Sequence, residues 1–294
     1  MSKTFLKGMY YIPTNDEDPY TILKNANKNK LNFIIIEYTN NDLFKNISNN
    51  KKQLSKLFYI QEKISSFEKK YKNTIGILCF KCRSVIGPIR ILLSKSIFRG
   101  EIFKLQNFYL WCYLNNPTLI LSNNNYYHIE NENIKKYFTL HSDNFLKSTD
   151  NYITLLNKNL KLTPIYTNNG FIFIKNINNS MFDFSKLKQH IITEIKNGNF
   201  YISNSDKYYL NFNVTSSKNK PLKINIEINN SDFLDQKFVL INNQNQIIKN
   251  QNLYNLKNIS YNFEIKNSAN KFLIFKIISK NGLFALTSPI YINN

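Results

Sequence analysis

The stretch GMYYIPTNDEDP, from Gly8 to Pro19, and the stretch LNFIIIEYTN, from Leu31 to Asn40, decide the fold of the first part of the chain. The first starts as a short apolar strand and ends at Asp18-Pro19, a good helix cap followed by a residue suited to the first helical turn. The second is apolar on both faces, which is typical of a buried parallel strand. Together they predict a strand–helix–strand unit.

Short apolar strands and amphipathic helices continue to alternate up to about residue 199. Such alternation favours a parallel α/β sheet or barrel, so residues 1–199 are predicted to form an α/β domain. The last helix ends at Gly198, which suits the position after a helix. We expect further strands at 74–80, 89–93, 117–122, 137–142 and 160–166, and further helices at 53–71, 100–113, 130–137, 149–159 and 184–198.

The sequence pattern changes after Gly198. Stretches such as KYYLNFNVTSS, LKINIEIN and KFLIFKIIS alternate apolar and polar residues, with Asn, Ser, Gly and Pro between them. This pattern is typical of antiparallel strands. Residues 200–294 are therefore predicted to form an all-β C-terminal module, a small antiparallel sandwich.

The chain carries a large positive charge. Its formal net charge is +20, and residues 51–104 hold thirteen Lys or Arg and three Glu, a net charge of +10. Such a patch is compatible with contact to nucleic acid or an anionic membrane surface. It is equally compatible with the solvated face of the helix expected at 53–71.

The cysteine content indicates the cellular compartment and limits disulfide formation and zinc binding. Three cysteines, Cys79, Cys82 and Cys112, are too few for a disulfide framework and suit a reducing environment. The Cys79-x-x-Cys82 pair lacks further ligands for zinc, so we interpret it as structural thiols. Without an export signal or a membrane-length apolar run in the given sequence, a cytoplasmic protein is expected, unless the natural start lies upstream.

Several stretches, in their order and spacing, resemble one known family. The segments GMYYIPT, KLNFIIIEYTN, NYITLLNKNLKLTPIYTNNGF, IITEIKNGNFYIS and NGLFALTSPIYI are similar to successive motifs of the polymerase-and-histidinol-phosphatase (PHP) superfamily. The last is similar to the tail of its carbaryl-hydrolase-like branch, in which a β module follows the barrel. The resemblance implies a distorted parallel (β/α)7 barrel with two or three metal ions at the carboxyl ends of the strands, where they would activate water for ester or phosphoester hydrolysis.

The chain departs from the family pattern at every metal-ligand position that can be placed. Phenol, pyrrolidine, hydrocarbon and amide groups stand where imidazoles and carboxylates are needed. The resemblance therefore implies a degenerate member that has lost its metals, and no cofactor is expected. The vestigial metal-site positions are Tyr11, Pro13, Tyr38, Thr39, Leu78, Asn123, Asn169 and Phe171.

Five other residues could line a pocket at the former metal site: Asp16, Glu37, Arg83, Arg90 and His141. Arginine forks could hold an anionic ligand where metals once sat. The favoured hypothesis is thus a catalytically inactive binding or scaffold module, a pseudoenzyme, with a small anion or a polyanion as partner. A partner protein or a second copy could also bind through the C-terminal β module.

Two alternatives stay open. One is a metal-dependent phosphoesterase or esterase with a site rebuilt on Glu37, Asp16 or His141 and holding Mn, Zn or Fe. The other is a basic nucleic-acid or membrane-surface binder that uses residues 51–104.

Overall fold

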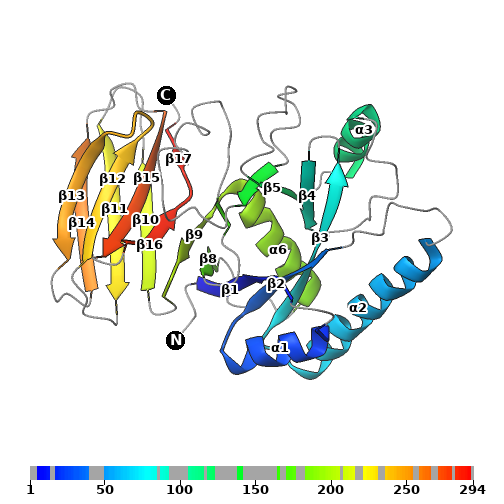
Figure 1. The fold of residues 1–294 in the computed structure, drawn as a ribbon. Helices are drawn as coiled ribbons and strands as arrows, with labels where there is room; N and C mark the ends of the chain where they lie inside the picture. Colours follow the sequence, from blue (N-terminus) through cyan, green and yellow to red (C-terminus); the bar gives the residue numbers. More distant parts are fainter. Residues whose placement is uncertain are drawn as a thin grey trace.

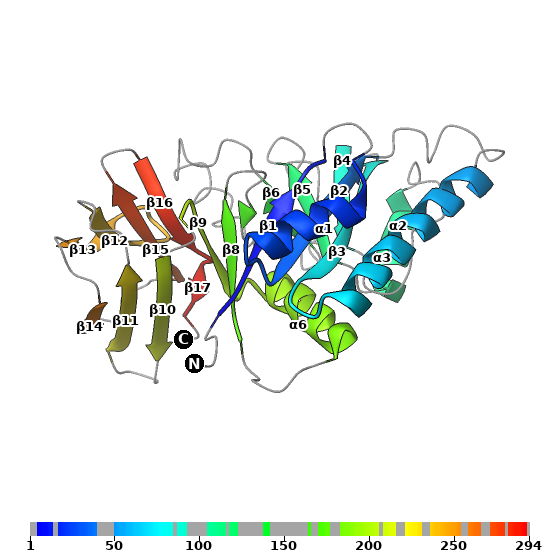
Figure 2. The ribbon, with the colours of Figure 1, turned by 90° about the horizontal axis from the view of Figure 1, so that it is seen from below.

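The computed structural model describes most of the strands and four helices of the chain (Figure 1). Its described residues are 5–13, 17–39, 50–84, 87–92, 105–115, 118–122, 138–141, 164–165, 170–176, 183–205, 208–215, 221–230, 236–253, 258–265, 271–279 and 282–292. The fold is mixed α/β, with a β-rich end and a helix-bearing end (Figure 2). None of the helices within these ranges is both long enough and apolar enough to cross a bilayer.

The first strand–helix–strand unit forms as the sequence predicts. Asp18 caps the first helix, its side chain accepting a hydrogen bond from the Thr21 amide at 3.1 Å, and Pro19 follows as the first helical residue. Strands β1, β2 and β3 are parallel neighbours. The elements are β1 (Phe5–Tyr11), α1 (Pro19–Lys28), β2 (Phe33–Thr39), α2 (Asn50–Lys70) and β3 (Ile75–Ser84).

The next strand runs the other way. Strand β4 is antiparallel to both β3 and β5, while β5, β6 and β7 are parallel to one another. The predicted distorted parallel (β/α)7 barrel is therefore correct only in part: the fold is mixed α/β, with β4 antiparallel to its neighbours. Only residues 85–86 separate β3 from β4, and a parallel crossover needs about a dozen residues or more. The elements are β4 (Gly87–Leu92), α3 (Leu105–Asn115), β5 (Thr118–Ser122), β6 (Phe138–His141) and β7 (Pro164–Ile165).

A strand that the sequence analysis missed, β8 (Phe171–Lys175), pairs antiparallel with β1. Helix α6 (Phe184–Asn197) follows it and ends at Gly198, whose φ of 73° is the predicted left-handed cap. Helix α6 contacts β3, β5, β6 and β8. If the sheet were flat, the strands from β8 to β6 would span about 29 Å. Helix α6 is only about 21 Å long but contacts strands at both ends of this span. The strands must therefore curve around this helix. Among the described strands no pairing closes the curve into a barrel.

The C-terminal part is the predicted antiparallel sandwich. Strands β10, β11 and β14 form one sheet, and the other strands extend the large sheet. Aromatic rings fill the space between the sheets, with the Phe238 centroid 5.4 Å from that of Phe275 and 5.2 Å from that of Tyr261. The elements are β9 (Phe200–Ser203), β10 (Tyr208–Thr215), β11 (Leu222–Asn230), β12 (Gln236–Asn242), β13 (Ile247–Leu253), β14 (Asn258–Ile265), β15 (Phe272–Ser279), β16 (Gly282–Thr287) and β17 (Ile290–Tyr291).

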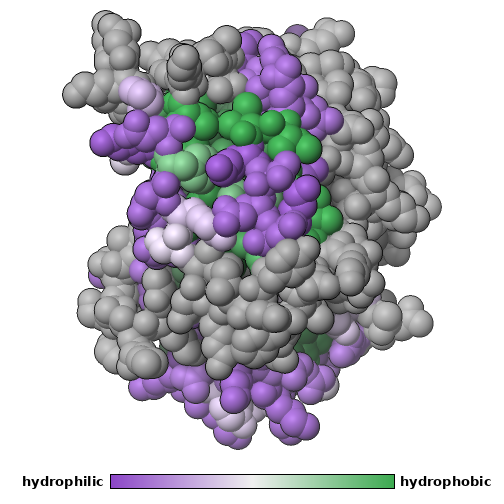
Figure 3. Space-filling view, turned by 90° about the vertical axis from the view of Figure 1, so that its left-hand side faces the viewer, coloured by the Kyte–Doolittle hydropathy of each residue, from purple (hydrophilic) through white to green (hydrophobic). Residues whose placement is uncertain are grey.

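The two parts share one sheet. Strand β9 pairs with β8 on one side and with β16 of the sandwich on the other, so the order runs unbroken from β13 to β7. The predicted boundary at residues 199 and 200 falls between α6 and β9, beside this continuous sheet. Seen from its end, the sandwich shows apolar atoms beside hydrophilic ones (Figure 3).

Candidate functional site

The carboxyl ends of β1, β2 and β3 place three polar side chains on one face of the sheet. Tyr10 is in register with Ile35, two residues before Glu37, and Glu37 is in register with Cys79. Because side chains alternate along a strand, Tyr10, Glu37 and Cys79 lie on the same face. Arg90 joins them from β4, where it is in register with Lys81, two residues beyond Cys79.

These four residues form a buried hydrogen-bonded network, called here the Glu37–Arg90 network. The Tyr10 hydroxyl and the Arg90 Nε both donate to Glu37 Oε2, each at 2.6 Å. The Tyr10 oxygen also lies 3.3 Å from Cys79 Sγ. Glu37 is 2% exposed and Arg90 is 5% exposed, so the ion pair has been removed almost completely from water.

Burial and charge set the protonation states of the network. Burial, with the nearby Cys79 and Glu37, raises the pKa of Tyr10 well above its ordinary value, so the phenol stays neutral and donates its proton. Burial acts against the charge of Arg90, but Glu37, Tyr10 and Cys79 together outweigh it and the pKa of the guanidinium is raised. The network therefore contains a neutral phenol at Tyr10 and a charged guanidinium at Arg90.

One donor of the network has no partner. The Arg90 Nη1 atom is buried and makes no hydrogen bond within the part of the chain that the structure describes. A guanidinium carries five N–H donors, and Glu37 engages only Nε here. A buried donor left without a partner costs about 1–3 kcal/mol. The site therefore lacks a hydrogen-bond acceptor for the Nη1 group of Arg90.

The structure brings together two of the predicted pocket residues, Glu37 and Arg90. The backbones of Thr39, Arg83 and His141 lie in β2, β3 and β6, but the structure does not describe their side chains. Asp16, Asn123 and Asn169 lie entirely outside the described residues. Pro13 is partly buried two residues after β1 ends.

Three of the vestigial positions point away from the Glu37–Arg90 network. A Cβ on Gly76 would approach Ile64 of α2 to 2.8 Å, so even-numbered residues of β3 face the helices. Leu78 shares that face by alternation, as does Tyr38, which is in parallel register with Phe80. Tyr11 likewise faces α1. Alternation puts Tyr10 and Cys79 beside Glu37, one residue away from the positions that the resemblance assigns.

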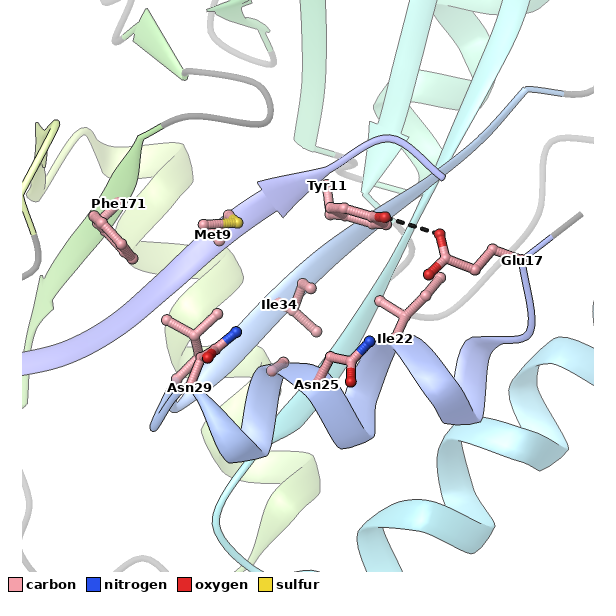
Figure 4. A pocket seen from close by; sticks show the side chains of 10 residues that line it. Met9, Tyr11, Glu17, Ile22, Asn25, Asn29, Ile34 and Phe171 are labelled. Carbon is pink, nitrogen blue, oxygen red and sulfur yellow. Dashed lines mark hydrogen bonds between the residues drawn. The ribbon is translucent and has the colours of Figure 1, made fainter. Parts of the chain in front are cut away.

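Tyr11 and Phe171 instead border a cavity of about 370 Å³ between β1, β2, β8 and α1 (Figure 4). The Tyr11 hydroxyl donates to Glu17 Oε2 at 2.8 Å. This bond, with partial burial, raises the pKa of Tyr11. The amides of Asn25 and Asn29 also line the cavity, so its lining combines apolar, aromatic and amide side chains.

Sequence reasoning missed Tyr10 and the contact of Cys79 with it. The missing signal was the strand register: Glu37 fixes which face of β2 points to the network, and alternation then selects Tyr10 and Cys79 in the neighbouring strands. Cys79 is buried and forms no disulfide bond within the described residues. In the described ranges, no three His, Cys, Asp or Glu side chains gather as they would around a metal.

Comparisons with known proteins give little beyond this geometry. No family model matches the chain, and no curated protein matches it. Among solved structures, the chain is similar to a two-domain protein from Bacteroides vulgatus containing a predicted PHP-like metal-dependent phosphoesterase. That match has a TM-score of 0.49 and 11% identity, and covers 98% of this chain and 95% of the other. An engineered protein matches with a TM-score of 0.24 and 6% identity, over 97% of this chain and 55% of its own. The family of the chain stays a prediction.

Proposed function

We propose that the α/β part binds a small anionic group without metal-dependent catalysis, and that Arg90 is the residue that holds this group. One observation carries the proposal. Arg90 is buried, its Nε is bound to Glu37 at 2.6 Å, and its Nη1 has no hydrogen-bond partner among the described residues.

The carboxylate at the end of β2 is poorly suited to a metal. Glu37 Oε2 already accepts two hydrogen bonds, from Tyr10 and from Arg90. A divalent ion at the same oxygen would meet the positive guanidinium at close range, and this repulsion is strong in a buried site. Arg90 therefore supplies beside Glu37 the positive charge that a metal would otherwise bring.

A phosphate or carboxylate group would satisfy what the network lacks. Its oxygens accept hydrogen bonds from a guanidinium in a planar, often bidentate geometry. The ligand must be small or present a small anionic group, because Nη1 is buried. Binding would then relieve the cost of an unpaired donor as well as add a charge pair.

The same geometry supports a finer proposal about ancestry: a degenerate PHP-type barrel of the carbaryl-hydrolase-like branch, with its metal ligands lost. Its support is the motif order in the sequence and the position of Glu37 at the end of the second strand. A phosphoesterase rebuilt around Mn, Zn or Fe is the competing function. It would require Glu37 to exchange Arg90 for a metal.

Thermal unfolding in inorganic phosphate tests the binding proposal. At a concentration 100 times the Kd, a bound ligand stabilises the folded state by about 2.7 kcal/mol. For a chain of 294 residues this corresponds to a rise in Tm of roughly 4 °C. Arg90→Lys keeps a cation beside Glu37 but removes the planar fork, so the rise should largely disappear.

Lys188→Gln is the matched control, because it breaks the ion pair of another buried carboxylate, Glu68, without touching Arg90. It should lower Tm in buffer and leave the phosphate-induced rise intact. A wild-type Tm that does not respond to phosphate would refute the proposal. Near-stoichiometric Mn, Zn or Fe in the purified protein would favour the phosphoesterase instead.

A further inference from the structure

Helix α3 exposes three large apolar side chains. Leu110, Tyr113 and Leu114 are 59%, 75% and 70% exposed, and their spacing of three and four residues places them on one face. We call these three residues the α3 stripe. Cys112, on a different face, is fully buried, and burial raises its pKa to about 12.

An ordinary surface helix exposes charged or polar residues on the side that faces water. Helix α3, LQNFYLWCYLN, contains no charged residue on any face. Three large apolar side chains exposed side by side indicate a surface that binds something, since single exposed apolar residues are normal but contiguous ones are not.

Charge identifies the kind of partner. The chain carries a net charge of +20, and residues 51–104, which directly precede α3, carry +10. The last twelve of these, LSKSIFRGEIFK, combine Lys95, Arg99 and Lys104 with five Leu, Ile or Phe residues and one glutamate. An apolar stripe on a strongly basic chain is complementary to an anionic surface with an apolar interior.

We propose that the α3 stripe inserts into the interface of an anionic lipid membrane, to which the net positive charge of the chain attracts it. Leucine partitions into the acyl region, while Trp111 and Tyr113 are of the two types enriched at headgroup depth. Membrane binding of this kind is peripheral and strengthens with the anionic lipid content.

Other partners fit the stripe less well. Two copies of a chain with a net charge of +20 repel each other, which disfavours self-association through this face. Nucleic acid is bound by cations and by stacking on aromatic rings, and Leu110 and Leu114 offer neither. The position of α3 also suits a flat surface, because it lies at the end of the molecule away from the sandwich (Figures 1 and 2).

Vesicle co-sedimentation tests the proposal, and the chain's single tryptophan, Trp111, reports on the same helix. The protein should sediment with vesicles of phosphatidylcholine containing about 30% phosphatidylserine and not with pure phosphatidylcholine, since the surface potential comes from the anionic lipid. Trp111 emission should shift to the blue on binding. Binding should weaken as salt screens the charges.

Leu110→Gln and Leu114→Gln should each weaken vesicle binding roughly tenfold, because each removes one buried leucine from the membrane. Glutamine has a similar helix propensity, so the fold should be retained, which circular dichroism checks. Ile247→Gln on β13 is the matched control: Ile247 is 59% exposed, and β13 lies at the opposite end of the molecule. This variant should bind as the wild type does.

Three results would overturn the proposal. The first is no sedimentation with anionic vesicles at low salt. The second is sedimentation that the two leucine variants leave unchanged. The third is a concentration-dependent dimer that these variants dissolve while vesicles bind nothing, which would make a second copy the partner.

Discussion

Two buried carboxylates on opposite faces of β3 are neutralised in different ways. Glu68, on α2, accepts the Gly76 amide at 2.9 Å and binds Lys188 of α6 through both oxygens, at 2.8 and 2.9 Å. Glu37, on β2, is bound by Arg90 through Nε alone, at 2.6 Å. The first pair is reached by water and the second is not, since the side chain of Lys188 is 30% exposed and that of Arg90 is 6% exposed.

The difference separates a structural contact from a candidate binding site. Spare donors on the Lys188 amine can be hydrated, so the pair with Glu68 is complete and joins α2, β3 and α6. The spare Nη1 donor of Arg90 is buried and unpaired within the described residues. Buried ion pairs without full hydrogen bonding add little to stability, so Arg90 is better explained by what it can bind.

Breaking the pair at Arg90 should have the largest effect on stability. Arg90→Met leaves the Glu37 carboxylate buried with only the Tyr10 hydroxyl as a partner. Removing one member of a buried pair typically costs about 3–5 kcal/mol. Urea unfolding at neutral pH should show this loss as a lower midpoint with an unchanged slope.

The double variant Glu37→Leu/Arg90→Met is the control for this measurement. Replacing both charges by apolar groups removes the unpaired carboxylate, and such replacements are often neutral or stabilising. Its stability should return close to that of the wild type. If Arg90→Met alone were as stable as the wild type, the carboxylate would have to be solvated and the Glu37–Arg90 network would not be the buried site described above.

Tyr10→Phe should have the next largest effect. It removes the hydroxyl that donates to Glu37 at 2.6 Å, and a hydrogen bond to a charged group contributes about 1.5–3 kcal/mol. The loss also depends on pH. Because burial raises the pKa of Tyr10 above its unfolded value of about 10, its contribution is complete below pH 10 and is lost as pH rises toward the folded pKa.

Urea unfolding between pH 8 and 11 checks this dependence. The wild type should lose stability above about pH 10, and Tyr10→Phe should lose it less steeply, by up to about 1.4 kcal/mol per pH unit. Some dependence should remain in the variant, since burial also raises the pKa values of Tyr201 and Tyr291. Identical pH profiles for the two proteins would mean that Tyr10 ionises freely.

Local sequence signals predicted the elements better than their directions. The Asp18-Pro19 start, the Gly198 end and the alternating C-terminal strands depend on neighbouring residues and form as expected. The direction of β4 and the pairing of β8 with β1 depend on the course of the chain. Only for β4 did the sequence hold a usable signal, the lack of a helix between it and β3.

The candidate site was predicted in part for a similar reason. Glu37 and Arg90 stand out because a charge in an apolar strand is costly unless it is paired. Tyr10 and Cys79 do not stand out, since Tyr and Cys are ordinary core residues. Their role depends on which face of β1 and β3 they occupy, and a shift of one residue exchanges the two faces.

Breaking the other pair, at Lys188, should have the smallest effect and so tests the comparison most directly. In Lys188→Met, Glu68 keeps its hydrogen bond from the Gly76 amide, and water can replace the partly exposed amine. The cost should be about 1 kcal/mol, in the range of solvent-accessible ion pairs. Urea unfolding of Lys188→Met beside Arg90→Met measures the contrast. Equal losses for the two variants would show that solvent access does not distinguish the pairs, and the unpaired donor of Arg90 would then lose its significance.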